Sequence, residues 1–290
     1  MCALYAFARL TDDIGDCPAS EPTRAALLAW WRAMAELNLS DPVAASSVMF
    51  PDPGLHALPS DHAAEFPFQM TVACRRIFPS LIDTAVRHQI PPQYFLEIID
   101  GVIAGQQKTR FDTFEQLEHY CYLVATAVGI ACLHIWGFRQ PLPMAAAVDC
   151  GLAFQLTNIL RDILEDSQHG RIYLPRQHYE QHGLVEDDLL TPRSDDRLRC
   201  LLVDEIARTE QLFQSGWRVW DSLEPDGRPI FSMMWRTYRA LLGEIERVPL
   251  AVATGRVTLP AHARLGLARD HFIRRRFEQL PLPGTAVVTR

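Results

Sequence analysis

Apolar residues recur at helical spacing along nearly the whole chain, and this regularity most limits the folds the chain can adopt. After Ser194, a candidate N-cap, they return at steps of three or four residues or near multiples: Leu198, Leu201, Leu202, Ile206, Leu212 and Phe213. Asp112 to Glu115 resembles a capping box ahead of another long helix. Clear strand alternation is absent from the sequence. The pattern predicts an all-α protein with about eight to ten helices.

The chain of 290 residues is long enough to bury a large core in one big domain or two ordinary ones. Its helical stretches are separated by short breaks that carry proline and glycine. No internal repeat and no long low-complexity linker divides it. We therefore expect one domain over residues 1–290, with a loose C-terminal tail from about residue 278.

Charge and cysteine content limit the environment and the partners. A net charge of −7 argues against nucleic-acid binding, and Arg274–Arg276 is expected to be a solvated helix face. Seven cysteines without a CxxC pair are typical of a reduced, cytoplasmic protein. Cys121–Phe138 has no Asp, Glu, Lys or Arg over eighteen residues, which a buried helix explains as well as a membrane span.

Two pairs of aspartates interrupt otherwise apolar helical stretches. Asp12 and Asp16 are four residues apart, as are Asp162 and Asp166, so each pair is expected on one helix face. Two carboxylates at this spacing repel each other unless a cation lies between them, and Mg²⁺ accepts carboxylates together with water and substrate phosphates. Two such pairs on facing helices would hold Mg²⁺ around a diphosphate, while neighbouring Leu and Ile line a hydrocarbon cavity. This chemistry fits an isoprenyl diphosphate.

Polar residues on the same helix strengthen the second pair. Gln155, Asn158 and Arg161 precede this pair at i, i+3 and i+6, near one helix face and close to Asp162. A buried polar group without a partner costs about 1–3 kcal/mol, and a metal-diphosphate cluster would supply partners for all of them. The first pair, taken by itself, is more typical of a solvated helix end.

Three stretches resemble the squalene/phytoene synthase family, the head-to-head isoprenyl diphosphate synthases. They are YAFARLTDDIGD (Tyr5–Asp16), HYCYLVATAVG (His119–Gly129) and QLTNILRDILEDSQHGRIYLP (Gln155–Pro175). The resemblance covers about residues 1–185 and continues more weakly to about 260. It implies an isoprenoid-synthase-type helical bundle around a central apolar cavity.

The resemblance also implies roles for individual residues. The implied Mg²⁺ ligands are Asp12, Asp16, Asn158, Asp162 and Asp166. The implied diphosphate-binding residues are Arg9, Asp13, Gln155, Asn158, Arg171, Tyr173 and Tyr238. Arg161 would orient metal and diphosphate, and Tyr120 would lie beside the reacting carbons. A core tyrosine with a satisfied hydroxyl is the alternative for Tyr120 and Tyr238.

The implied reaction joins two farnesyl or two geranylgeranyl diphosphates. One allylic diphosphate ionises, the double bond of a second molecule attacks its cation, and a cyclopropylcarbinyl diphosphate forms. This intermediate ionises again, rearranges and is quenched by hydride, water or proton loss, giving a squalene- or phytoene-type product. The sequence leaves open C15 against C20 substrates, the use of NADPH and the oligomeric state. No GxGxxG follows a strand, so no dinucleotide-binding fold is expected.

One departure from the family supports an alternative. Family members usually have a further helix before the first motif, whereas this sequence starts inside the helix that carries Asp12. A non-catalytic scaffold is therefore one alternative, and a chain-elongating prenyltransferase or terpene cyclase is another. The GRIYLP segment and the RDxxxD form of the second motif argue against elongation or cyclisation. An oily product makes peripheral membrane contact an expectation for product release.

Overall fold

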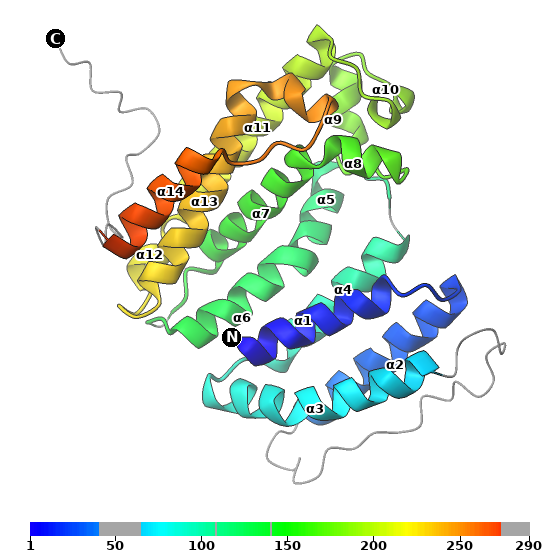
Figure 1. Cartoon of the computed structure of the whole chain (residues 1–290), viewed down its shortest axis with the longest axis vertical. Coiled ribbons are helices and arrows are strands. Elements are labelled where there is room, and N and C mark those ends of the chain that lie inside the picture. The colour runs from blue at the N-terminus through cyan, green and yellow to red at the C-terminus, as the bar shows by residue number, and fades with distance from the viewer. Residues whose placement is uncertain (41–64, 108, 140, 274–290) are drawn as a thin grey trace. The chain divides into compact units, whose positions relative to one another are not determined.

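The computed structural model describes residues 1–40, 65–107, 109–139 and 141–273, and within them the regular elements are helices (Figure 1). In chain order the helices are α1 Cys2–Gly15, α2 Glu21–Leu39, α3 Glu65–Arg87, α4 Pro92–Gln107, α5 Phe114–Cys121, η2 Tyr122–Thr126, α6 Ala127–Trp136, α7 Met144–Arg161, α8 Ile163–Gln168, α9 Arg176–Gln181, α10 Glu186–Leu190, α11 Asp196–Gly216, α12 Val219–Ser222, α13 Arg228–Arg247, η3 Pro249–Ala253, α14 Ala261–Ala268 and η4 Arg269–Ile273. The all-α class is confirmed. Eight to ten helices was too low an expectation, because several breaks in the pattern contain short helices of four to six residues.

Backbone contacts divide the chain into two compact units. The N-terminal unit comprises Met1–Lys108 and Leu123–Ile135, and the C-terminal unit comprises Thr109–Tyr122 and Trp136–Arg290. The expectation of one domain stays a prediction. The expected loose tail from residue 278 and the Arg274–Arg276 run lie outside the described residues.

The core of the N-terminal unit is built from the apolar faces of α1 to α4 (Figure 1). Phe7 of α1 is fully buried and lies 5.3 Å from the Trp31 ring and 5.5 Å, edge on, from the Phe95 ring. The Trp31 indole donates a 2.9 Å hydrogen bond to the Thr11 hydroxyl, so its polar end is satisfied inside the core. This packing fixes the face of α1 opposite its aspartates.

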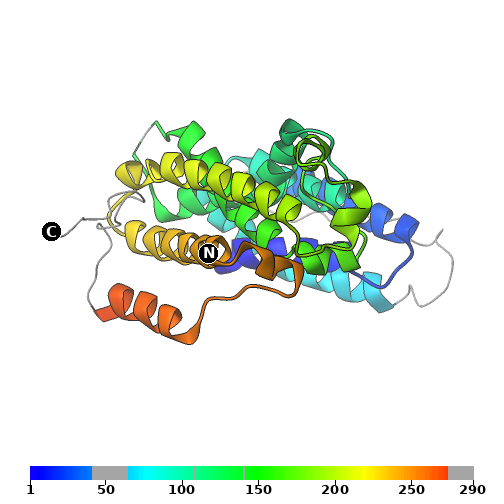
Figure 2. The same cartoon turned by 90° about the horizontal axis from the view of Figure 1, so that it is seen from above.

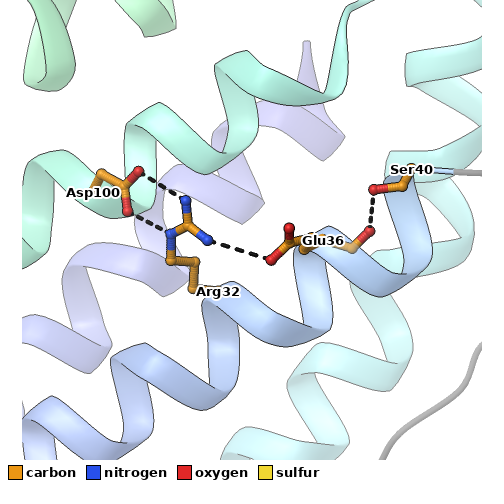
Figure 3. A network of polar contacts seen from close by, with 4 residues as sticks. All are labelled: Arg32, Glu36, Ser40 and Asp100. Carbon is orange, nitrogen blue, oxygen red and sulfur yellow. Dashed lines mark hydrogen bonds and ion pairs between the residues drawn. The ribbon is translucent and has the colours of Figure 1, made fainter.

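A polar contact joins α2 to α4 at the edge of this core (Figure 3). The Arg32 guanidinium donates to both carboxylate oxygens of Asp100 at 2.7 and 3.2 Å, and to Glu36 at 3.4 Å. The hydrogen bond to Asp100 raises the pKa of Arg32. Both partners are partly exposed, so this two-pronged pair fixes geometry more than it adds stability.

The C-terminal unit is built around α7, which packs against α11 and α13 (Figures 1 and 2). The α7 and α11 helices approach closely at Gly216, where an added Cβ would lie 2.8 Å from the Cys150 Cα. Phe213 extends the interface, with its ring 5.9 Å from Phe154 and 5.6 Å from Trp235. The stripe expected from the leucine spacing is buried on α11 except for Leu212, which is partly exposed.

Helix ends differ from the expectations by one residue. The α11 helix is capped by Asp195 and not by Ser194, since the Asp195 carboxylate accepts the Leu198 N–H at 2.9 Å. The α5 helix is capped by Thr113, whose hydroxyl accepts the Gln116 N–H, while the Asp112 N–H donates to the Gln116 side-chain oxygen at 3.0 Å. The cap therefore lies one residue later than in the expected box, and Gln116 binds the residue before the cap rather than the cap itself.

Within the described residues, Phe114–Trp136 is the stretch long and apolar enough to cross a membrane, with a mean hydropathy of 1.4. This criterion rests on length and composition, which core helices of soluble proteins also satisfy, and it is weak evidence for a span.

Candidate active site

The first acidic pair lies at the C-terminal end of α1 in the N-terminal unit. Asp12 belongs to the last turn, and Asp16 caps the helix through a 2.8 Å hydrogen bond from its N–H to the Asp12 carbonyl. The two residues are thus one turn apart, as expected from the sequence. Arg9 pairs with Asp13 at 2.8 Å, and both side chains are largely exposed.

The environment of Asp12 disfavours the ionised form of its carboxyl group. Its side chain is exposed, yet surrounding protein atoms reduce the solvation of its carboxylate. This partial burial raises its pKa, with Asp16 as the next cause, while Arg9 acts in the opposite direction. A cation bound between Asp12 and Asp16 would relieve the repulsion.

The second acidic pair lies at a break between α7 and α8 in the C-terminal unit. Asp162 ends α7 with φ −102° and ψ 13°, and Asp166 lies in α8. The Asp162 N–H donates to the Asn158 carbonyl, and the Asp166 N–H donates to the Asp162 carbonyl. One-turn spacing therefore persists across the break, although the sequence predicted an uninterrupted helix.

Two arginines neutralise Asp162. Arg161 donates from Nε at 2.7 Å, and this hydrogen bond is the main cause that raises the Arg161 pKa. Arg256, from the loop before α14, lies 3.0 Å from Asp162 and 3.6 Å from Glu165. These side chains border a hollow of about 410 Å³, lined by Arg161, Asp162, Leu164, Glu165, Gln168, His169 and Arg256.

Asn158 carries an unsatisfied oxygen one turn before Asp162. Its Oδ1 is buried and has no hydrogen-bond partner, while its Nδ2 donates to Gln155 at 3.5 Å. A buried amide oxygen in this state costs about 1–3 kcal/mol unless a ligand completes it. Mg²⁺ prefers such oxygen donors.

Asp166 faces a small, mainly apolar hollow whose lining includes Ile159, Ile163 and Arg171. Burial there, followed by the charge of Asp162, raises its pKa to about 6, and Arg171 acts in the opposite direction. Protons therefore compete with a cation for this carboxylate more strongly than for an ordinary aspartate.

Tyr120 and Tyr173 stack on one another beside this acidic pair. Their ring centroids are 5.6 Å apart, and each also lies within 6 Å of the Phe111 ring, at 5.4 and 5.9 Å. Burial is the main cause that strongly raises the Tyr120 pKa, so its phenol stays neutral. An apolar ring face with a neutral hydroxyl can stabilise a nearby carbocation.

Tyr238 of α13 reaches the second motif from another helix. Its ring stacks on Phe154 of α7 at 4.6 Å, and its phenol group is among the lesser causes of the raised pKa of Arg161, after the hydrogen bond to Asp162. This proximity agrees with the expected position near the diphosphate site, and the role itself stays a prediction.

The oxygen donors of the second motif fit Mg²⁺, but they do not form a complete coordination shell. Among the residues that the structure describes, no cluster of three or more His, Cys, Asp or Glu is arranged to hold a metal ion. Asp162, Asp166 and the orphaned Asn158 oxygen form an incomplete set of hard ligands. Mg²⁺ commonly completes such a set with water and phosphate oxygens.

The structure groups most of the expected residues within their own units. Arg9, Asp12, Asp13 and Asp16 share one end of α1, while the second motif, Tyr120, Arg171, Tyr173 and Tyr238 gather in the C-terminal unit. The expectation that the two acidic pairs face one another stays a prediction, as does the central apolar cavity. Sequence reasoning missed Arg256 and Phe111, because neither lies in a recognisable pattern.

Comparison with known proteins decides the family. A sequence model described as squalene/phytoene synthase matches residues 1–263. The chain belongs to the squalene/phytoene synthase family. The predicted family and the predicted enzyme class, the prenyltransferases of this family, are therefore confirmed.

Family members with similar sequences are phytoene synthases. The chain is 30% identical over 277 residues to 15-cis-phytoene synthase of Synechococcus elongatus, covering 91% of this chain and 80% of that protein. It is 31% identical over 271 residues to the chloroplastic phytoene synthase 3 of Zea mays, covering 91% of this chain. The chain spans 56% of the maize protein's length.

Solved structures of the family share the fold. Squalene synthase HpnC from Alicyclobacillus acidocaldarius superposes with a TM-score of 0.69 at 27% identity, covering 88% of this chain and 83% of that one. A dehydrosqualene synthase superposes with a TM-score of 0.68 at 21% identity, covering 92% and 83%, which supports the fold only. The comparisons favour head-to-head condensation over the scaffold, elongation and cyclisation alternatives.

Proposed function

We propose that this chain catalyses the Mg²⁺-dependent head-to-head condensation of two prenyl diphosphates, either farnesyl or geranylgeranyl diphosphate. The observation that carries the proposal is the buried, partnerless Oδ1 of Asn158 one turn before Asp162 and two turns before Asp166. A protein that used this helix only as a scaffold would gain nothing from an orphaned oxygen beside two carboxylates.

The second motif contains two kinds of binding residue, oxygen ligands for Mg²⁺ and arginines for diphosphate. Asp162, Asp166 and Asn158 would supply oxygen ligands to Mg²⁺, and bound Mg²⁺ would neutralise charge as diphosphate leaves. Asp12 and Asp16 of the N-terminal unit would be a second carboxylate pair able to bind Mg²⁺. Arg161, Arg171 and Arg256 would donate to diphosphate oxygens. Because Arg161 and Arg256 already neutralise Asp162, they are held beside the position where negative charge would arrive.

The aromatic cluster would act on the hydrocarbon part of the substrate. After the first diphosphate leaves, the cation is attacked by the second double bond, and a cyclopropylcarbinyl diphosphate forms with loss of a proton. Tyr120, Tyr173 and Phe111 would present ring faces to the cations and exclude water. The neutral Tyr120 hydroxyl could hold or pass the departing proton without carrying charge.

Product analysis tests this function. Purified protein is incubated with Mg²⁺ and labelled farnesyl or geranylgeranyl diphosphate, with and without NADPH, and the extract is separated by chromatography. A C30 or C40 product, or its cyclopropyl diphosphate, supports the proposal. A longer linear diphosphate, a cyclic C15 product or no diphosphate release refutes it, and the NADPH arms show whether hydride quenches the final cation.

We also propose that the protein is cytoplasmic and touches a membrane surface through its C-terminal helices. The α14 helix buries none of its residues, and Leu265, Phe272 and Ile273 are 71–77% exposed. Arg264 and Arg269 are exposed on the same segment, and exposed apolar residues with arginines suit an anionic lipid surface.

A vesicle assay tests the membrane proposal. Sedimentation with phosphatidylglycerol vesicles should carry the protein down, and replacing Leu265, Phe272 and Ile273 together by Ser should leave it in solution. Equal sedimentation of the two proteins, or none with the native chain, contradicts membrane contact through this segment.

A further inference from the structure

Two segments about sixty residues apart are joined along their backbones within the C-terminal unit. The Ile172 N–H donates to the Thr109 carbonyl at 3.0 Å, and the N–H groups of Arg176 and Gln177 donate to Phe111 and Asp112 at 2.8 and 3.1 Å. Residues 109–112 lead into α5, which carries Tyr120, and residues 170–175 contain Arg171 and Tyr173. The approach to α5 therefore supports the loop that carries two of the expected binding residues.

The Arg110 side chain ties this junction to a third element. Its Nη1 donates to the Gly170 carbonyl at 2.7 Å and to the carbonyl of Thr109, the residue before Arg110, at 2.9 Å. Its Nε donates at 2.8 Å to Glu186 in α10. The Arg110 guanidinium therefore engages three groups.

The turn at Gly170 sets the direction of the loop. Gly170 has a φ of +68°, and the next N–H, that of Arg171, returns to the Asp166 carbonyl at 2.8 Å. Two residues later, Tyr173 stacks on Tyr120. A rotation of the Gly170 peptide would therefore move Arg171 relative to Asp166 and Tyr173 relative to Tyr120.

We propose that Arg110 is a positioning residue: by holding the Gly170 carbonyl and Glu186 together, it keeps Arg171 and Tyr173 in their reactive orientation. The expected effect on kcat rests on the proposed condensation, whereas the expected effect on the order of residues 171–173 does not. The contacts argue against a direct phosphate contact by Arg110, because its Nη1 and Nε already donate to neighbouring groups. The orientation of Arg171 and Tyr173 should matter for turnover, since an error near 1 Å in a reacting assembly can cost about a hundredfold in rate.

Three variants separate the parts of the Arg110 contact. Arg110→Met keeps the length of the side chain and removes every donor, Arg110→Lys keeps the charge, and Glu186→Gln removes the ion pair while leaving both carbonyl bonds. Arg247→Met is the matched control, because Arg247 forms a 3.0 Å pair with Glu244 on the exposed surface of α13. Each protein is measured by steady-state kinetics, by thermal unfolding and by hydrogen exchange at the amides of residues 171–173.

Arg110→Met should lower kcat roughly tenfold or more while changing KM less than about threefold, and should speed exchange at the Ile172 amide. Arg110→Lys should recover part of both effects. The kcat and the exchange rate of Glu186→Gln should lie between those of Arg110→Lys and the native chain, and those of Arg247→Met should match the native chain. Unfolding temperatures should agree among the four variants within a few degrees.

Three results would overturn the inference. These are a kcat for Arg110→Met within twofold of native, a loss confined to KM, which would indicate direct substrate contact, or unchanged exchange at residues 171–173. If the native chain releases no diphosphate, the condensation fails by itself, and the exchange arm still decides whether Arg110 holds the loop.

Discussion

The guanidinium of Arg256 lies 3.0 Å from the carboxylate of Asp162, although the two residues are separated by most of the C-terminal unit in sequence. Arg161 contacts the same carboxylate from the adjacent position. Asp162 is therefore neutralised before any ligand is bound, and diphosphate binding would require these arginines to exchange a carboxylate for phosphate oxygens. Mg²⁺ bound at Asp162 would replace the positive charge of these arginines, which would lower the cost of the exchange in a partly buried site.

Removing Arg256 should therefore weaken substrate binding. We expect Arg256→Met to raise the KM for prenyl diphosphate roughly tenfold with a smaller change in kcat, because a charge-assisted hydrogen bond contributes about 1.5–3 kcal/mol. The measurement is initial diphosphate release at saturating Mg²⁺. Arg199→Met, in an exposed pair on α11, is the control. An unchanged KM for Arg256→Met would show that Arg256 only neutralises Asp162.

Activity should fall on the acid side of the pKa of Asp166, which burial and Asp162 raise to about 6. Protons and Mg²⁺ compete for this carboxylate, so the half-saturating Mg²⁺ concentration should rise as pH decreases from 7.5 to 5.5. More Mg²⁺ should move the acid limb to lower pH. A Mg²⁺ requirement that is independent of pH over this range would exclude Asp166 as a ligand.

The raised pKa of Asp166 has the opposite consequence for the stability of the metal-free protein, which it favours at low pH. Since the folded pKa lies above the ordinary value of 3.8, the contribution of Asp166 is fully present below pH 3.8 and is lost as pH rises through about 6. Asp166→Asn should remove this slope from denaturant unfolding measured between pH 4 and 7. Identical slopes for both proteins would contradict the assignment of the pKa.

Tyr120 should act as a neutral phenol. Because burial strongly raises its pKa, turnover should show no basic limb from Tyr120 up to about pH 10. Tyr120→Phe keeps the ring stacked on Tyr173 and should lower turnover by roughly tenfold if the hydroxyl handles a proton. Tyr94→Phe, a buried tyrosine of α4, is the control. Full activity of Tyr120→Phe would show that the ring of Tyr120, and not its hydroxyl, contributes to turnover.

The parts of the site that follow from local spacing could be predicted from the sequence. Asp12 and Asp16, like Asp162 and Asp166, are one turn apart because helical periodicity requires it, and the long second motif identified the family. Arg256 could not be found this way, since it lies in a loop that reaches Asp162 through tertiary packing. The break at Asp162 was also missed, because the apolar pattern continues through it into Ile163 and Leu164.

Other misses have a comparable physical origin. The one-residue shift from Ser194 to Asp195 reflects two adjacent side chains that can both cap a helix, a choice made by backbone geometry. The contacts of Arg110 could not be predicted either, because a basic residue near a helix end is usually hydrated. Its binding to Gly170 depends on a loop sixty residues away, and no local pattern contains that information.

A buried pair in the C-terminal unit should be important for stability. His178 Nδ1 lies 2.5 Å from Glu205 Oε1, and the two side chains are 9% and 3% exposed. Glu205→Leu should lower the free energy of unfolding by about 2–4 kcal/mol, because His178 is left buried without its partner. Combining it with His178→Phe should recover part of that loss in urea unfolding. Additive losses in the double variant would mean that the pair is not coupled.

Gly216 should tolerate substitution poorly, because it lies in the α7–α11 interface. An added Cβ would lie 2.8 to 2.9 Å from the backbone and Cβ of Cys150, where neither helix can yield without shifting its neighbours. We expect Gly216→Ala to lower the free energy of unfolding by about 1–3 kcal/mol, despite the better helix propensity of alanine. Gly266→Ala in α14, whose Cβ would meet nothing within 4 Å, should be neutral or stabilising by up to about 1 kcal/mol. Equal unfolding midpoints for the two variants would show that α7 and α11 do not approach this closely.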